Sequence, residues 1–104
     1  MTMRKLIVDG KVAVLYSPDF GAGWSTWNEL HPEILFDPAM VKLVENEQYD
    51  ELATYVELKY PGIFTGGLKK LQVEWIEEGK KFRVVEYDGS ESIQLEDDID
   101  WMIA

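Results

Sequence analysis

"LIVDGKVAVLY", residues 6–16, is the stretch that decides the fold, because it has the pattern of two β-strands joined by a tight turn. Asp9-Gly10 readily supplies the positive φ angles of a type I′ hairpin turn. Both arms are nearly continuous apolar runs, which is typical of strands covered on both faces. Pro18 ends the second arm, since proline cannot donate a hydrogen bond to a sheet. The sequence therefore predicts an N-terminal hairpin with cover on each side.

Two helices are expected after this hairpin. Asp37-Pro38 is a helix start, because aspartate accepts from the first-turn amides and proline is favoured at the first helical position. A second helix is expected from about Glu47 to Lys59, where apolar side chains recur three and four residues apart. Pro61 and the glycine after it end this second helix.

Three strands are expected in the C-terminal part. Residues 71–75 alternate between apolar and polar, and residues 82–87 and 91–95 flank Asp88-Gly89, a second two-residue hairpin signal. We expect the three to form an antiparallel meander. The order of elements predicts one α+β domain over residues 1–104, with a mainly antiparallel sheet of about five strands and two helices on one side.

The charge of the chain limits its partners. Ten basic and twenty acidic residues give a formal net charge of −10, which opposes binding to polymeric DNA or RNA. The same charge suits a basic protein partner or imitation of nucleic acid. The chain has no cysteine, so thiolate chemistry and cysteine-bound zinc are excluded, and no apolar run has membrane-spanning length. We expect a protein of the reducing cytoplasm, without membrane contact.

"FGAGWSTWN", residues 20–28, begins like two catalytic or cofactor motifs and completes neither. The hydrolase pattern G-x-S-x-G fails at Trp27, and the only histidine that could serve as a base for Ser25 is His31, six residues away. The dinucleotide pattern G-x-G-x-x-G fails at Thr26. We therefore expect no catalytic residue and no cofactor.

This loop and a second glycine loop, "YPGIFTGGLKK", remain the predicted ligand site. Glycines let the backbone approach a ligand, hydroxyls donate to phosphate or sugar oxygens, and a tryptophan ring stacks on a base. The two loops would meet within one chain or across a homodimer. The alternative is that the tryptophans only pack in the core. The predicted ligand-binding residues are Gly21, Gly23, Trp24, Ser25, Thr26, Trp27, Asn28, Thr65, Gly66, Gly67 and Lys69.

No metal site is predicted. His31 lies near acidic residues but lacks a further ligand at suitable spacing, and the aspartates after residue 96 lack the glycine and closing glutamate of a calcium loop. The acidic C-terminal part forms instead a candidate edge for a basic partner, with Trp101 and Met102 as its apolar anchor. The alternative is a solvated acidic face with a docked end, as a short helix or an extended tail. The acidic residues of this edge are Glu86, Asp88, Glu91, Glu96, Asp97, Asp98 and Asp100.

Three segments, "VAVLYSPDFGAGWSTWN", "YPGIFTGG" and "FRVVEYDGSESI", together resemble a family of small acidic proteins of bacteriophage and prophage genomes. The resemblance covers most of the chain and assigns no catalytic residue. It implies a phage protein in the host cytoplasm that binds host machinery or a host signal, and sponges for immune nucleotides are one such class. The first hypothesis is thus a non-catalytic binder of a small nucleotide-like ligand. The alternative is an acidic interaction module that inhibits a host protein.

Overall fold

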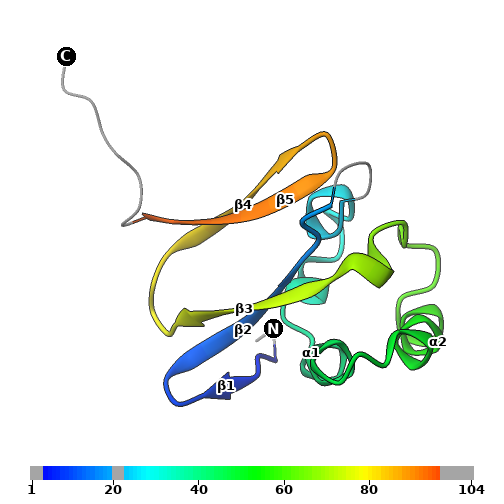
Figure 1. Cartoon of the computed structure of the whole chain (residues 1–104), viewed down its shortest axis with the longest axis horizontal. Helices are drawn as coiled ribbons and strands as arrows, with labels where there is room; N and C mark the ends of the chain where they lie inside the picture. The colour runs from blue at the N-terminus through cyan, green and yellow to red at the C-terminus, as the bar shows by residue number, and fades with distance from the viewer. Residues whose placement is uncertain (1–3, 20–22, 97–104) are drawn as a thin grey trace.

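Strand β2 (Lys11–Tyr16) lies at the centre of the fold, between the helices and the last two strands. The computed structural model describes residues 4–19 and 23–96. These residues form an α+β fold with five antiparallel strands and two α-helices, as the sequence predicts, but the strands lie in two sheets instead of one. Figure 1 shows the helices to one side of β2 and the C-terminal hairpin away from them.

The two faces of β2 belong to two different apolar clusters. Ala13 and Leu15 pack in the larger cluster with side chains of both helices, whereas Val12 and Val14 pack against Ile76 and the C-terminal hairpin. All four side chains are buried. The expectation of cover on both faces is therefore confirmed for this strand.

Strand β1 (Ile7–Val8) corrects that expectation for the first arm of the hairpin. Its two side chains are 45% and 48% exposed, and the strand pairs only with β2 at the edge of the sheet. Both arms are nearly continuous apolar runs, so apolar composition alone does not distinguish a central strand from an edge strand. The turn between them is as predicted, with Asp9 and Gly10 both at positive φ.

The expected C-terminal meander is divided between two sheets. Strand β3 (Gln72–Glu77) pairs with β2 along its whole length, from Lys11 opposite Glu77 to Tyr16 opposite Gln72. Strands β4 (Phe82–Tyr87) and β5 (Ser90–Leu95) form a separate hairpin. An alternating pattern identifies the buried face of a strand but not its partner. Here the partner of β3 is β2, the second strand of the N-terminal hairpin.

Helices α1 (Pro38–Glu45) and α2 (Tyr49–Lys59) cover one face of the β1–β3 sheet. The start of α1 is as predicted. Helix α2 begins two residues later than expected, because Glu47 has a φ of +56° and belongs to the turn between the helices. Within residues 4–19 and 23–96, three short 3₁₀ turns lie outside the helices: η1 (Ser25–Trp27), η2 (Pro32–Leu35) and η3 (Leu68–Lys70).

Asp37 joins the two helices through its buried carboxylate. It caps α1 and also accepts hydrogen bonds from the end of α2. Burial acts to raise the pKa of Asp37, but the hydrogen bonds outweigh it and hold this pKa below its ordinary value. Burial and the same carboxylate raise the pKa of Tyr60. The described donors to Asp37 are the amides of Ala39 and Met40, the hydroxyls of Tyr55 and Tyr60, and Lys59 Nζ.

Replacing Asp37 by alanine is expected to lower the free energy of unfolding by about 2–4 kcal/mol, since a helix cap is lost and a buried tyrosine hydroxyl loses its acceptor. Urea unfolding at pH 7 measures the change. Glu57→Ala, on the exposed face of α2, is the matched control and should change stability by less than about 0.5 kcal/mol. Equal losses in the two variants would contradict the role of Asp37.

The contribution of Asp37 to the free energy of unfolding should decrease at acidic pH. Its pKa is lower in the folded chain than the ordinary value of 3.8, so its stabilisation is complete above that value and is lost as the pH falls through the folded pKa. The stability difference between the wild-type protein and Asp37→Ala should therefore shrink on acidification below about pH 4. Urea unfolding from pH 7 to pH 3 checks this, and a difference that stays constant would be inconsistent with it.

Candidate functional site

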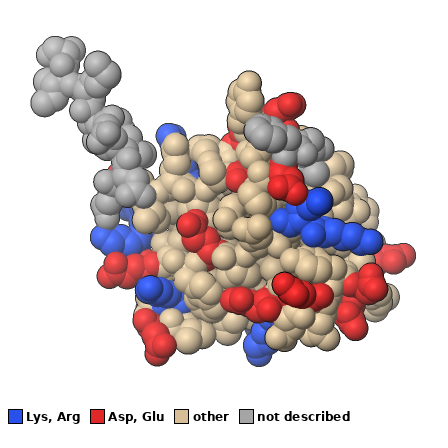
Figure 2. All heavy atoms as spheres, in the orientation of Figure 1, with Lys and Arg blue, Asp and Glu red and all other residues tan. Residues whose placement is uncertain are grey.

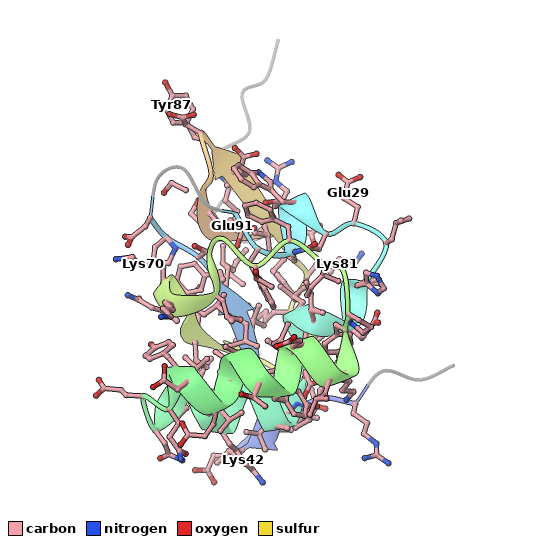
Figure 3. All side chains as sticks on the ribbon, turned by 90° about the vertical axis from the view of Figure 1, so that its right-hand side faces the viewer. Glu29, Lys42, Lys70, Lys81, Tyr87 and Glu91 are labelled. Carbon is pink, nitrogen blue, oxygen red and sulfur yellow. The ribbon has the colours of Figure 1, made fainter. Side chains whose placement is uncertain are left out.

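Glu91 is a buried carboxylate that holds the first glycine loop in place. It is the second residue of β5 and is only 2% exposed. Ser17 N donates to Oε1 at 2.9 Å, and Trp24 N and Thr26 N donate to Oε2 at 2.9 and 3.1 Å. Thr26 Oγ1 also donates to Oε2, at 2.5 Å. Figure 3 shows Glu91 inside the molecule, between the C-terminal hairpin and the loops.

The environment of Glu91 explains how an ionised group is tolerated there. A buried carboxylate costs several kcal/mol unless hydrogen bonds replace its water. Among the described residues no cation pairs with Glu91, so backbone amides and one hydroxyl carry this compensation. The amides of Trp24 and Thr26 therefore already donate to a carboxylate of the chain itself, and they are not available to an anionic ligand.

Sequence reasoning placed Glu91 on an acidic surface, and this placement is wrong. The residue lies on the same face of β5 as Ile93 and Leu95, which pack against the smaller apolar cluster. The signal was present in the sequence, because positions 91, 93 and 95 share one face of a strand. A glutamate at an inward position indicates a buried polar partner, and that partner is the loop after β2.

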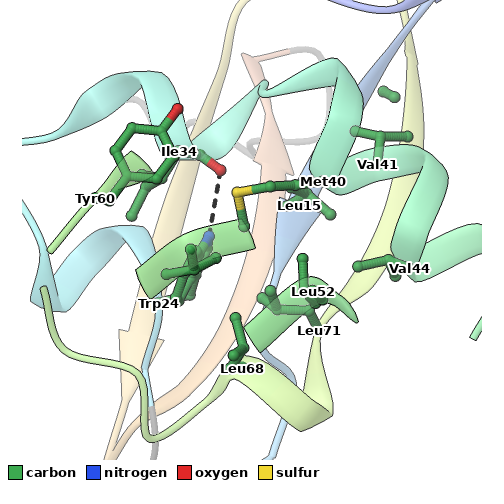
Figure 4. Packing of buried hydrophobic residues seen from close by; sticks show 12 residues of the cluster. Leu15, Trp24, Ile34, Met40, Val41, Val44, Leu52, Tyr60, Leu68 and Leu71 are labelled. Atoms are coloured by element: carbon green, nitrogen blue, oxygen red, sulfur yellow. Dashed lines mark hydrogen bonds between the residues drawn. The ribbon is translucent and has the colours of Figure 1, made fainter. Parts of the chain in front are cut away.

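The two tryptophans of this loop have different surroundings. Trp24 is 0% exposed and packs in the larger cluster, with its indole Nε1 donating to the carbonyl of Ile34 at 3.3 Å. Figure 4 shows the ring enclosed by apolar side chains of that cluster. Trp24 is therefore a core residue with no surface for a ligand. Trp27 is 40% exposed.

Trp27 and Phe64 form an exposed pair of rings, which we call the aromatic platform. Their centroids are 4.8 Å apart at an interplanar angle of 57°, and each residue is 40% exposed. Glu86 Oε2 accepts from the indole Nε1 of Trp27 at 3.2 Å. The glycines provide the space: a Cβ on Gly23 would lie 2.8 Å from the ring of Trp27, and one on Gly66 would lie 2.5 Å from that of Phe64.

Asn28 joins the two glycine loops. Its side-chain Nδ2 donates to the carbonyls of Trp24 and Phe64, both at 3.0 Å, and its Oδ1 accepts from Phe64 N at 2.8 Å. The residue is buried. The two loops therefore meet within one chain, and the platform is built from one ring of each.

The other predicted ligand-binding residues are distributed around this junction. Ser25 is half-buried, Thr65, Gly66 and Lys69 are exposed, and Gly67 is buried. Lys70, next to Lys69, lies 3.5 Å from Asp19 across the two loops. Gly21 and the predicted partner-binding residues Asp97, Asp98, Asp100 and Trp101 lie outside the described residues, as does the C-terminal segment expected to be a helix or a tail.

His31 lies at the start of η2, where its backbone N donates to the carbonyl of Asn28 at 2.9 Å. Its Nδ1 is 3.5 Å from Glu33 Oε1, and its ring meets that of Tyr60 edge-on at 6.3 Å. Within residues 4–19 and 23–96, no group of three histidine, aspartate or glutamate side chains is arranged to hold a metal ion. The acidic side chains seen in Figure 2 are interspersed with basic and uncharged ones over that face.

Comparison of the chain with protein-family models, with curated proteins and with solved structures found no match in any of the three. In the part of the chain that the structure describes, no helix has the length and apolar character to cross a membrane. The features that bear on function are therefore the platform, the two glycine loops that carry it and the charges around them.

Glu91→Gln should destabilise the fold by about 1.5–3 kcal/mol, because an amide group has one acceptor atom and would turn its NH₂ towards backbone donors. Urea unfolding measures the loss. Glu77→Gln, on the exposed side of β3, removes the same charge and should be nearly neutral. If the two substitutions cost the same, net charge rather than the Glu91 hydrogen bonds would be responsible.

Proposed function

We propose that the protein is a non-catalytic binding protein whose aromatic platform takes a flat, nucleotide-like ring. The observation that carries this proposal is the exposed ring pair of Trp27 and Phe64. Because the sequence also resembles small acidic phage proteins, the role we propose is sequestration of a nucleotide-type host signal.

The platform is held in place before any ligand arrives. Asn28 fixes the spacing of the two loops, and Glu91 fixes the backbone on either side of Ser25. Binding to a preorganised surface loses less conformational entropy than binding to a mobile one. Stacking of one base on an aromatic side chain is worth about 1–3 kcal/mol, so two braced rings are enough to anchor a small ligand.

Polar groups of the same loops complete the proposed site. Ser25 and Thr65 supply hydroxyls, and Lys69 supplies an exposed positive charge, all within five residues of a platform residue in the sequence. Hydroxyl and ammonium groups are suitable donors to sugar and phosphate oxygens. The Trp24 and Thr26 amides are not part of this set, because Glu91 already accepts from them.

A second candidate function uses the same platform for a protein partner. Glu86 lies at the edge of Trp27, and the chain carries a net charge of −10, so a lysine or arginine side chain would meet both a carboxylate and an aromatic face. Cation–π contacts of this kind contribute about 0.5–2 kcal/mol. This is the acidic interaction module of the alternative hypothesis, with a basic segment of a host protein as the partner.

Calorimetric titration distinguishes the two candidates. We expect mononucleotides or cyclic dinucleotides to bind, and Trp27→Ala to weaken that binding by about tenfold or more because one stacking surface is lost. Leu30→Ala, almost fully exposed on the same connection, is the matched control and should leave binding unchanged.

A nucleotide panel without any binding would refute the first candidate. Binding of an arginine- and lysine-rich peptide instead, lost in both Trp27→Ala and Glu86→Gln and weakened by salt, would establish the second candidate. Nucleotide binding that survives Trp27→Ala would place the ligand elsewhere on the protein and contradict the platform as its site.

A further inference from the structure

A groove of about 1060 Å³ lies between η2, the start of α1, the end of α2 and the N-terminal segment that contains Arg4. It shares no lining residue with the aromatic platform. Its size is that of a small-molecule site. The groups that give it chemical character are Arg4, His31, Lys42, Tyr55, Lys59 and Tyr60.

The charge of the groove is opposite to that of the protein as a whole. Three of the ten lysine and arginine residues and the one histidine line it, against Glu33 and Asp37. Asp37 is saturated by donors, and Lys59 pairs with it at 3.0 Å. Arg4 and Lys42 form no ion pair with any described residue. Arg4 and Lys42, neither of which has an ion-pair partner among the described residues, therefore both line this groove of a strongly acidic chain.

The walls of the groove are rigid and largely apolar. Three of the four prolines of the chain, Pro32, Pro38 and Pro61, line it. The rings of His31 and Tyr60 meet edge-on beside them. Lys5 lies with its Nζ 4.6 Å from the ring centroid of Phe36, which holds the segment containing Arg4 against this part of the fold. Such a surface is preformed for a ligand with a ring and an anionic group.

We infer that this groove is a second ligand site, which binds a small molecule carrying a phosphate group on a ring or other apolar portion. Arg4 and Lys42 hold the phosphate, since an arginine fork and a lysine ammonium are the usual side-chain partners of that group. The prolines and the Tyr60 ring contact the apolar portion. The site is separate from the aromatic platform and does not depend on it.

Phenyl phosphate is the probe, titrated at low salt and followed by ¹H–¹⁵N NMR of the whole chain. We expect saturable binding with shifts centred on the amides around Ala39 and Tyr60. The Arg4→Ala/Lys42→Ala variant should bind about tenfold more weakly or worse, because two charge-assisted contacts are lost. Lys11→Ala, an exposed cation on β2 away from the groove, is the matched control and should change the affinity by less than about twofold.

Three results would overturn the inference. They are no saturable binding of phenyl phosphate, an equal loss in Lys11→Ala, or equal affinity for benzoate, which has the ring and a charge but no phosphate. Trp27→Ala separates this site from the platform, because phosphate binding in the groove should be unchanged in that variant. Unfolding midpoints of all variants at saturating probe concentration confirm that each one is folded.

Discussion

The carboxylate of Glu91 is the constraint on which the surface of this protein depends. Residues 17–36 connect β2 to α1, and a connection of that length loses about 1–2 kcal/mol of backbone entropy for each residue it orders. Glu91 gathers three amides of this connection around one anion, and Glu91 N donates to the carbonyl of Ser17 at 2.7 Å. These hydrogen bonds join the start of β5 to the end of β2. As a result Trp24 packs in the core and Trp27 stays exposed at the surface.

A second buried carboxylate, Asp37, holds the other end of the connection in place. It caps α1 and accepts from Tyr55, Lys59 and Tyr60 near the end of α2. Two internal acids therefore bracket the long connection, each held by donors distant in sequence. The platform lies near the first acid and the groove near the second. A small acidic domain can in this way order a loop that has little regular secondary structure, and can present different chemistry at its two ends.

Local signals in the sequence predicted the elements of the fold well, and long-range pairing poorly. Asp9-Gly10, Asp88-Gly89 and Asp37-Pro38 each specify a backbone conformation within a few residues, and all three turns or caps form as expected. The pairing of β3 with β2 instead of β4 is not encoded in any one of these strands. It depends on which partner buries more apolar surface, and β2 is buried on both faces.

The candidate site was predicted in part for the same reason. Glycine and aromatic composition pointed to the two loops, and Asn28 does bring them together. Composition did not separate Trp24 from Trp27, because both have the same side chain and only the contacts of Glu91 and Ile34 decide which one is buried. The sequence did not predict the groove, because Arg4, Lys42 and Lys59 are far apart in the sequence and none belongs to a motif.

Amide hydrogen exchange, read residue by residue by NMR, tests most directly whether Glu91 holds the loop. The amides of Ser17, Trp24 and Thr26 lie outside the strands, yet their hydrogen bonds to a buried carboxylate predict exchange as slow as that of the β2 amides. Glu29, exposed on the same connection, is the fast-exchanging reference. Exchange of those three amides at the rate of Glu29 would contradict the account, because Glu91 would then not be holding them.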